Sequence, residues 1–122
     1  MDSGCYQLKI EIRENISLKI GALGVCRFAK GNYVYTGSAM KNLSRRVARH
    51  KSQEKKLRWH IDYLLAHCSV GLVKVEIYPS EKKEECFYNQ NLLKSGAKAV
   101  ISKFGSSDCK TCPSHLLKVL SF

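Results

Sequence analysis

Arg46 and His50 lie four residues apart in a basic stretch, residues 43–51, whose spacing predicts an amphipathic helix. Leu43 and Val47 define the apolar stripe of this helix, and Arg46 and His50 fall beside it, within a sector of roughly 100 degrees. Cations that served only solubility would lie opposite the stripe. We therefore expect these two side chains to line a cleft. The alternative is a solvated basic helix along which Arg46 snorkels.

Glu85 has a comparable position on a later predicted helix. Cys86, Leu92 and Leu93 all lie within about 100 degrees of it on the helical wheel. A carboxylate on an apolar face costs desolvation energy unless it is paired or binds a metal. Glu85 therefore lies either in a functional site or at the edge of the apolar helix face. The adjacent Glu84 is the alternative candidate for the acidic residue of such a site.

The C-terminal segment contains C-x-x-C-x-x-H, formed by Cys109, Cys112 and His115. This motif would supply three zinc ligands, but a tetrahedral structural site needs a fourth, and none is obvious nearby in the sequence. We therefore predict buried thiols and a capping His115, largely free of metal under reducing conditions. The neighbouring Asp108 is a further candidate for the cleft.

Strands with period-two alternation must position these groups. Residues 6–12 alternate apolar and polar side chains and predict a half-buried strand. Residues 16–28 predict a second strand with glycine breaks, and residues 31–37 predict a third, so that the three would form an antiparallel meander. Residues 70–78 predict a strand with Val73, Val75 and Ile77 facing inward.

Helices are expected between and after these strands. The first begins near Leu43, with Asn42 or Ser44 as its cap, and runs to the mid-fifties. A second covers residues 57–68, and a third begins after Pro79 and ends before Gly96. The tail predicts a short apolar strand, a turn-rich segment and a last short helix. The sequence thus predicts a single α+β domain over residues 1–122, with a small, about three-stranded antiparallel sheet flanked by helices.

Composition narrows the partner class. The chain has 122 residues, 21 Lys plus Arg, 10 Asp plus Glu and a formal net charge of +11. Such an excess attracts polyanions, so nucleic acid is the leading partner, and the alternative is a merely soluble basic protein. No membrane-spanning segment or signal peptide is evident, and six cysteines without an export signal favour reduced thiols. We therefore expect a cytoplasmic protein.

Several motifs together resemble the GIY-YIG nuclease superfamily. They are Gly4-Cys5-Tyr6, Tyr35-Thr36-Gly37 and the L-x-x-R-x-x-x-H spacing of Leu43, Arg46 and His50. The stretches RWHIDYLL, EECFYNQNLL and FGSSDCKTCPSHL look like the small, stand-alone branch called Uri-type endonucleases. The resemblance covers nearly all of the chain. It departs at Cys5 and Thr36, which replace the usual isoleucines, and in the long separation of Tyr6 from Tyr35.

The resemblance implies a three-stranded sheet flanked by helices, and one divalent ion, Mg²⁺ or Mn²⁺, held by Glu85. It implies that Tyr6 helps take a proton from water, that Tyr35 hydrogen-bonds to the nucleophile or phosphate, and that Arg46 braces the phosphate. His50 would be an auxiliary member. A tight turn at Gly37 would bring the strand end and the helix together. The structural alternative for Tyr6 is a core residue with a satisfied hydroxyl.

The positive side chains outside this set are expected to contact phosphates along nucleic acid, with DNA favoured over RNA. They are Lys41, Arg45, Arg49, Lys51, Lys55, Lys56 and Arg58. His60 and Asp62 either lie near the same groove or cap and tie structural elements. Because the chain has no second domain, specificity would come from nucleic-acid shape or from a protein partner.

Three hypotheses follow from the sequence. The first is a metal-dependent endonuclease that hydrolyses phosphodiester bonds. The second is a non-catalytic nucleic-acid-binding module on the same fold, which would be favoured if the tyrosines were buried or Glu85 pointed away. The third is a zinc or thiol protein that uses Cys109, Cys112 and His115.

Overall fold

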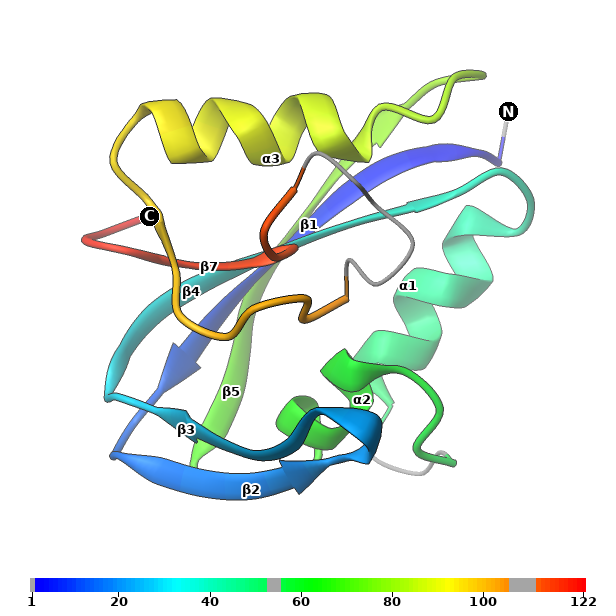
Figure 1. Cartoon of the computed structure of the whole chain (residues 1–122). Helices are drawn as coiled ribbons and strands as arrows, with labels where there is room; N and C mark the ends of the chain where they lie inside the picture. The colour runs from blue at the N-terminus through cyan, green and yellow to red at the C-terminus, as the bar shows by residue number, and fades with distance from the viewer. Residues whose placement is uncertain (1, 53–55, 106–111) are drawn as a thin grey trace.

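The computed structural model describes residues 2–52, 56–105 and 112–122. These residues form an α+β fold with a five-stranded antiparallel sheet, in the order β5-β1-β4-β7-β6, and a separate β2–β3 hairpin (Figure 1). The strands are β1 (Gly4–Ile12), β2 (Ile16–Ile20), β3 (Gly24–Phe28), β4 (Gly31–Ala39), β5 (Val70–Pro79), β6 (Lys98–Ala99) and β7 (Leu116–Val119), and the helices are α1 (Leu43–Lys51), α2 (His60–Leu65) and α3 (Glu85–Lys94). The predicted α+β class is confirmed, although the sheet has more strands than the three expected.

Strand β1 lies inside the sheet, between β4 and β5. Its alternating apolar side chains, Tyr6, Leu8, Ile10 and Ile12, are all buried in the core, as the period-two pattern predicts. The predicted meander is wrong, because the next segment does not pair with β1. Residues 16–28 instead close on themselves as the β2–β3 hairpin through a short 3₁₀ turn.

Strand β5 is an edge strand, and its predicted inward face is wrong at two of three positions. Val73 is 57% exposed and Ile77 is 46% exposed, whereas Leu72 and Val75 pack against the core. For Val73 the reason is a register shift between Lys9 and Ile10 of β1, opposite Lys74 and Leu72, which skips this residue of β5. A bulge of this kind breaks the simple alternation of sides. The shift does not account for Ile77, which keeps regular register with Val75 and is nevertheless exposed.

The helices are shorter than predicted. Helix α1 ends at Lys51, and its first turn is capped by Asp2, whose carboxylate accepts hydrogen bonds from the Ser44 amide and hydroxyl. The predicted side-chain cap from Asn42 is not formed. Helix α2 covers only residues 60–65, and α3 begins at Glu85, several residues after Pro79. Local periodicity therefore located the helices but overestimated their length.

The predicted C-terminal helix is also wrong, because residues 116–119 form β7. This strand pairs antiparallel with β4, with Tyr35 opposite Leu116 and Asn32 opposite Val119. Leu116 and Leu117 are both buried, although neighbouring residues of a strand point to opposite faces of the sheet. A short continuous apolar run of this kind does not distinguish a strand from a helix by its periodicity. Strand β4 already pairs with β1 on one side, and β7 provides hydrogen-bond partners for the backbone groups on the other side of β4.

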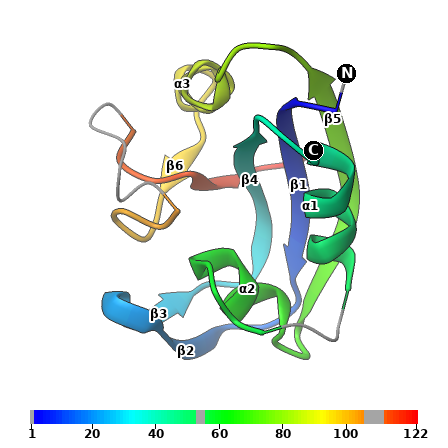
Figure 2. The same cartoon turned by 90° about the vertical axis from the view of Figure 1, so that its right-hand side faces the viewer.

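The arrangement in space brings distant segments together. In the view of Figure 1, the diagonal formed by β1 and β4 runs between α3 and the pair of α1 and α2. Figure 2 shows the same elements after a quarter turn, with α1 beside the β1 and β5 strands and α3 at one end of the molecule. In the described ranges, no helix is both long and apolar enough to cross a membrane.

Candidate active site

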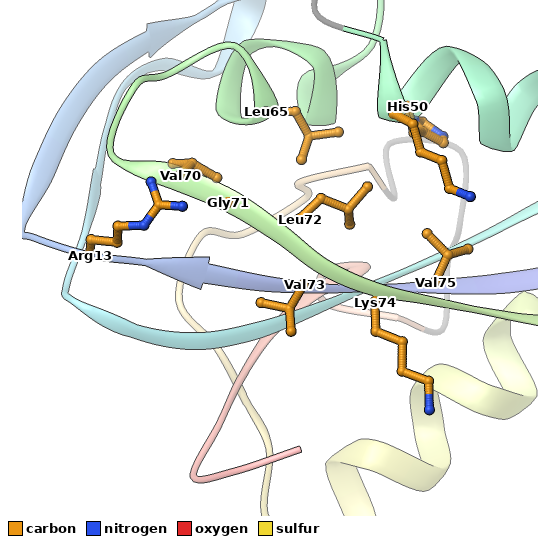
Figure 3. A pocket seen from close by; sticks show the side chains of 10 residues that line it. Arg13, His50, Leu65, Val70, Gly71, Leu72, Val73, Lys74 and Val75 are labelled. Carbon is orange, nitrogen blue, oxygen red and sulfur yellow. The ribbon is translucent and has the colours of Figure 1, made fainter.

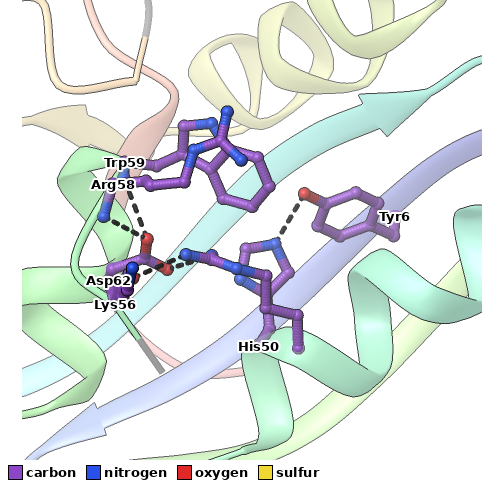
Figure 4. A network of polar contacts seen from close by, with 7 residues as sticks. Tyr6, His50, Lys56, Arg58, Trp59 and Asp62 are labelled. Carbon is purple, nitrogen blue, oxygen red and sulfur yellow. Dashed lines mark hydrogen bonds and ion pairs between the residues drawn. The ribbon is translucent and has the colours of Figure 1, made fainter. Parts of the chain in front are cut away.

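Tyr6 of β1 and His50 of α1 meet in the buried core beside β4. The Tyr6 hydroxyl lies 2.7 Å from His50 Nε2, and the two side chains are 2% exposed (Figure 4). Tyr6 pairs across the sheet with Gly37, where an added Cβ would lie 2.6 Å from Tyr6 Cζ. The predicted tight turn at Gly37 is therefore wrong: β4 continues to Ala39, and the glycine provides space for the tyrosine ring.

Arg46 and Glu85 approach the same strand end from two helices, and Ser38 of β4 joins them. The Arg46 guanidinium donates to the Ser38 carbonyl oxygen at 2.6 Å, and the Ser38 hydroxyl donates to Glu85 Oε2 at 2.6 Å. Arg46 and Glu85 are both half-buried. Within the described ranges, Arg46 forms no ion pair with a carboxylate. The two charges therefore share one serine without neutralising each other directly.

The two glutamates at the start of α3 have different surroundings. Glu85 Oε2 accepts from Ser38, whereas Glu84 Oε1 accepts from the Ser80 hydroxyl at 3.3 Å. The exposed Lys83 amine lies 3.9 Å from Glu85 Oε1, a surface contact that contributes little. Glu85 is thus the acid beside Arg46, and its carboxylate together with the Ser38 hydroxyl forms an oxygen-only donor set suited to a hard cation.

Tyr35 of β4 completes the group. It is 8% exposed, its ring packs edge-on against His50 and Phe104, and its hydroxyl makes no hydrogen bond within the described part of the chain. Burial raises the pKa of Tyr35, the nearby Glu85 carboxylate raises it further, and Arg46 opposes the rise. Burial likewise raises the pKa of Tyr6, with Tyr35 adding to it and Arg46 opposing it. Four side chains are therefore close enough to act on one another electrostatically, namely Tyr6, Tyr35, Arg46 and Glu85.

Trp59, which precedes α2, provides an aromatic surface for three arginines. The guanidinium carbons of Arg46, Arg49 and Arg58 lie 4.9, 4.3 and 5.7 Å from its ring centroid. The His50 ring also contacts it, at a centroid distance of 5.8 Å. Cation–π contacts of this kind hold guanidinium groups in place without using their hydrogen-bond donors. Trp59 therefore connects the Tyr6–His50 pair to a concentrated positive charge (Figure 4).

Asp62 has a structural role. Its side chain is fully buried, accepts from the backbone amides of Arg58 and Trp59 at 2.9 Å, and forms an ion pair with Arg49 at 2.8 Å. Burial alone would raise the pKa of Asp62, but these two amides and Arg49 outweigh it and hold the pKa below its usual value. Asp62 caps α2 and ties it to α1.

His60 also ties elements together. Its Nδ1 accepts from the Gly105 amide at 2.9 Å, and its ring packs against Phe104. Burial lowers the pKa of His60, so the neutral form that accepts this bond is favoured. Of the two interpretations left open for His60 and Asp62, the contacts favour the structural one.

The other predicted cations are mostly exposed. Arg49 is half-buried and engaged with Asp62, whereas the remaining described members are at the surface. The exposed members are Lys41, Arg45, Lys51, Lys56 and Arg58. Lys55 lies outside the described residues.

A second cluster contains sulfur and nitrogen ligands. The ligand atoms of Cys86, Cys112 and His115 all lie within 4.8 Å of one another. Cys109 and Asp108 lie outside the described residues. Cys86 comes from α3 and was not foreseen as a cluster member, because nothing in the sequence links it to residues 26 and more positions away.

Ser38 and Trp59 were also not foreseen as site residues. Ser38 directly follows the Tyr35-Thr36-Gly37 motif, so its place at the strand end was a usable signal. Trp59 lies in a basic stretch at the start of the predicted second helix, a setting in which an aromatic ring often contacts cations.

A separate hollow of about 560 Å³ lies between β5, α1 and α2 (Figure 3). It is lined mostly by consecutive residues of β5, from Val70 to Val75, together with Leu65, Lys51 and Arg13. It shares only His50 with the site described above. The hollow therefore does not contain the convergence of Tyr6, Arg46 and Glu85.

Comparison with known proteins gives one match. Residues 5–121 match the model of a family described as a domain of unknown function, DUF123. No curated protein and no solved structure matches the chain.

Proposed function

The chain belongs to the DUF123 family of domains of unknown function, and we propose that it is a metal-dependent endonuclease acting on nucleic-acid phosphodiester bonds. The observation that carries this proposal is the convergence of Tyr6, Tyr35, Arg46 and Glu85, contributed by β1, β4, α1 and α3. These are the residues that resemblance to the GIY-YIG nuclease superfamily implies. They are far apart in sequence, so their meeting at one strand end supports a shared role.

Arg46 is suited to bind the scissile phosphate. Arg46 donates one N–H to the Ser38 carbonyl oxygen and interacts with the Tyr6 hydroxyl, while the Trp59 ring against it uses none of its five donors. The remaining donors can meet two phosphate oxygens in the planar, two-pronged geometry that arginine prefers. Glu85 does not neutralise this arginine directly, so the positive charge is retained for the substrate.

Glu85 is the residue that would hold the divalent ion. A single carboxylate beside a serine hydroxyl fits Mg²⁺ or Mn²⁺, because Mg²⁺ in such sites keeps several waters and uses only one or two carboxylates together with substrate phosphate. A bound ion of this kind would supply positive charge next to the oxygens on which negative charge develops during hydrolysis. The residues present therefore fit the ion that the resemblance implies.

Tyr6 and His50 can move the proton of the attacking water. Burial raises the pKa of Tyr6, so its phenol is protonated near neutral pH. When His50 Nε2 carries no proton, the Tyr6 hydroxyl donates to it at 2.7 Å. Tyr6 can then accept the proton of water while its own passes to His50, and the resulting hydroxide attacks phosphorus as the leaving oxygen departs. The Tyr35 hydroxyl can orient the water or the phosphate.

The charge of the chain supports a nucleic-acid partner. A net charge of +11 with exposed lysines and arginines around α1 favours phosphate contacts that carry no sequence information. We propose DNA as the preferred substrate over RNA, with specificity supplied by nucleic-acid shape or by a protein partner. We place this activity in the cytoplasm.

The second candidate is a non-catalytic nucleic-acid-binding module. The burial of Tyr6 and Tyr35, at 2% and 8% exposed, favours it, because a buried phenol reaches substrate only through a narrow opening. The position of Glu85 beside Arg46 favours the enzyme. Binding alone would still depend on Arg46 and the exposed cations.

A cleavage assay separates the two candidates. Purified protein is incubated with supercoiled plasmid, branched DNA and structured RNA, with Mg²⁺, Mn²⁺ or excess EDTA. The endonuclease proposal predicts nicking or cutting of at least one substrate, lost with EDTA. Binding of these substrates with no cleavage under any metal condition would instead favour the binding module. A binding constant that does not change between low and physiological salt would remove the electrostatic basis of both.

A further inference from the structure

We propose that Cys86, Cys112 and His115 form a second metal site, specific for a soft divalent ion, with zinc as the expected occupant. The three ligand atoms lie within 4.8 Å of one another, and Cys86 Sγ lies 4.0 Å from His115 Nε2. The donors come from α3 and from the segment that leads into β7. This site does not depend on the endonuclease proposal, because it shares no residue with the Arg46–Glu85 corner.

The spacing of the donors suits zinc. With zinc–sulfur bonds of about 2.3 Å and zinc–nitrogen bonds of about 2.0–2.1 Å, two ligands of a tetrahedral ion lie roughly 3.5–3.8 Å apart. The observed separations need only small side-chain movements to reach that value. Sulfur and imidazole donors favour zinc over magnesium, whereas the oxygen donors of Glu85 and Ser38 favour the reverse.

Burial and charge also favour a bound ion. Cys112 is 2% exposed and His115 is 4% exposed, while Cys86 is partly buried. Zinc binding would convert both thiols to thiolates and release their two protons to solvent. Two thiolates and a neutral imidazole around Zn²⁺ give a site with no net charge, which avoids the cost of burying an unpaired charge.

The surroundings of the cluster hold it in place. Gln90, one turn after Cys86, donates to Cys112 Sγ at 3.6 Å, and Asn89 donates to the Ser114 carbonyl at 2.7 Å. The His115 amide also donates to the Phe104 carbonyl at 2.8 Å. The bonds from Asn89 and Gln90 fasten α3 to the C-terminal segment, and the His115 amide ties that segment to Phe104, so a metal here would hold α3 and the C-terminal segment together.

This proposal departs from the sequence-based prediction of metal-free thiols. That prediction rested on the lack of a fourth ligand in C-x-x-C-x-x-H, and the structure adds Cys86 from a distant helix. Cys109 has the two-residue spacing to Cys112 that zinc ligands often show, but it lies outside the described residues. The proposal therefore rests on three protein ligands, with the fourth position open to water.

The first test uses the unmodified chain, purified under reducing conditions without added metal. Metal analysis should find about one zinc per chain. Replacement by Co²⁺ should produce the near-ultraviolet absorption of thiolate-to-cobalt charge transfer, and excess Mg²⁺ should not displace it. Removal of zinc with a strong chelator should lower the thermal unfolding midpoint by at least about 5 °C, and zinc should restore it. Substoichiometric zinc together with Co²⁺ spectra that lack the thiolate band would overturn the proposal.

Variants then identify the ligands. Cys86→Ser and His115→Gln should each weaken zinc binding by more than about 100-fold, because loss of a ligand costs more than the roughly 10–100-fold loss seen for residues that only support ligands. Cys68→Ser is the matched control, since Cys68 is an exposed cysteine outside the cluster, and it should bind zinc like the parent. Circular dichroism checks that each variant is folded. Parent-like zinc affinity in Cys86→Ser would contradict the assignment.

Discussion

Helix α1 presents two arginines to two carboxylates, and the two pairs are built in opposite ways. Arg49 contacts Asp62 directly at 2.8 Å, and Asp62 is fully buried and accepts two further backbone hydrogen bonds. Arg46 and Glu85 instead meet through Ser38, which accepts from the arginine and donates to the glutamate. Arg49 and Asp62, which bind each other directly, are called the closed pair. Arg46 and Glu85, whose charges both stay available to other partners, are called the open pair.

The difference shows how the same residue types serve stability or chemistry. A fully buried carboxylate that already accepts three hydrogen bonds has little room for a ligand, but its loss leaves the arginine without its carboxylate and two amides without their acceptor. A carboxylate and an arginine separated by a neutral side chain can each accept a partner, such as a cation and a phosphate. The Trp59 ring lies against both arginines. The two pairs differ in whether the carboxylate contacts its arginine directly or through Ser38.

The largest expected effect comes from removing the acid of the open pair. Glu85→Gln should lower Mg²⁺-dependent cleavage about 100-fold or more with the fold unchanged, because the lost charge acts on the transition state and not on the core. The measurement is single-turnover cleavage at saturating protein. Arg46→Ala should show a similar loss.

Glu84→Gln is the matched control for this prediction, since its carboxylate accepts from Ser80 and lies one residue away. It should cleave like the parent. If Glu84→Gln lost activity and Glu85→Gln did not, Glu84 would be the residue that holds the ion. If neither variant lost activity, the proposal that one ion is bound beside Arg46 would be wrong.

Removing the acid of the closed pair should affect stability instead. Asp62→Ala should lower the free energy of unfolding by about 3 kcal/mol, since it leaves a half-buried arginine and two amides without their acceptor. Urea denaturation measures this change. Glu11→Ala, which breaks an exposed ion pair with Arg13, should cost no more than about 1 kcal/mol. Equal losses in the two variants would show that Asp62 is not a structural centre.

The closed pair should also respond to acid. The pKa of Asp62 is lower in the folded state than in the unfolded chain, so its contribution to stability is complete above the unfolded pKa of about 3.9. The contribution should disappear as the pH falls through the lower, folded pKa. Denaturation midpoints measured from pH 6 to pH 2 should fall less steeply in Asp62→Asn than in the parent. Parallel curves would argue against a stabilised carboxylate.

The smallest effects are expected for nucleic-acid binding by the open pair. Arg46→Ala removes one phosphate contact among many, so affinity should drop only a few-fold, and the slope of log affinity against log salt should decrease by about 0.7–0.9. Glu85→Gln removes a negative charge and should leave binding unchanged or slightly tighter. Fluorescence anisotropy at several salt concentrations measures both. A large loss of binding in Glu85→Gln would mean that the metal is needed for binding.

The sequence by itself determined the local features of the site. The period-two pattern placed Tyr6 among the buried residues of β1, and helical spacing placed Arg46 and His50 beside the apolar stripe of α1. These predictions succeeded because each depends on residues within one element, where side-chain direction follows from backbone geometry alone. The basic net charge is likewise a property of composition.

Tertiary structure decided which elements meet. Pairing of β7 with β4, closure of the β2–β3 hairpin and the bulge in β5 depend on competition between apolar runs that look alike in sequence. The same long-range packing placed Ser38 between Arg46 and Glu85, and brought Cys86 to Cys112 and His115. Neighbouring glutamate and cysteine residues of α3 thus reach two different clusters, because adjacent helical positions point about 100 degrees apart and the surrounding strands and tail supply different partners on each side.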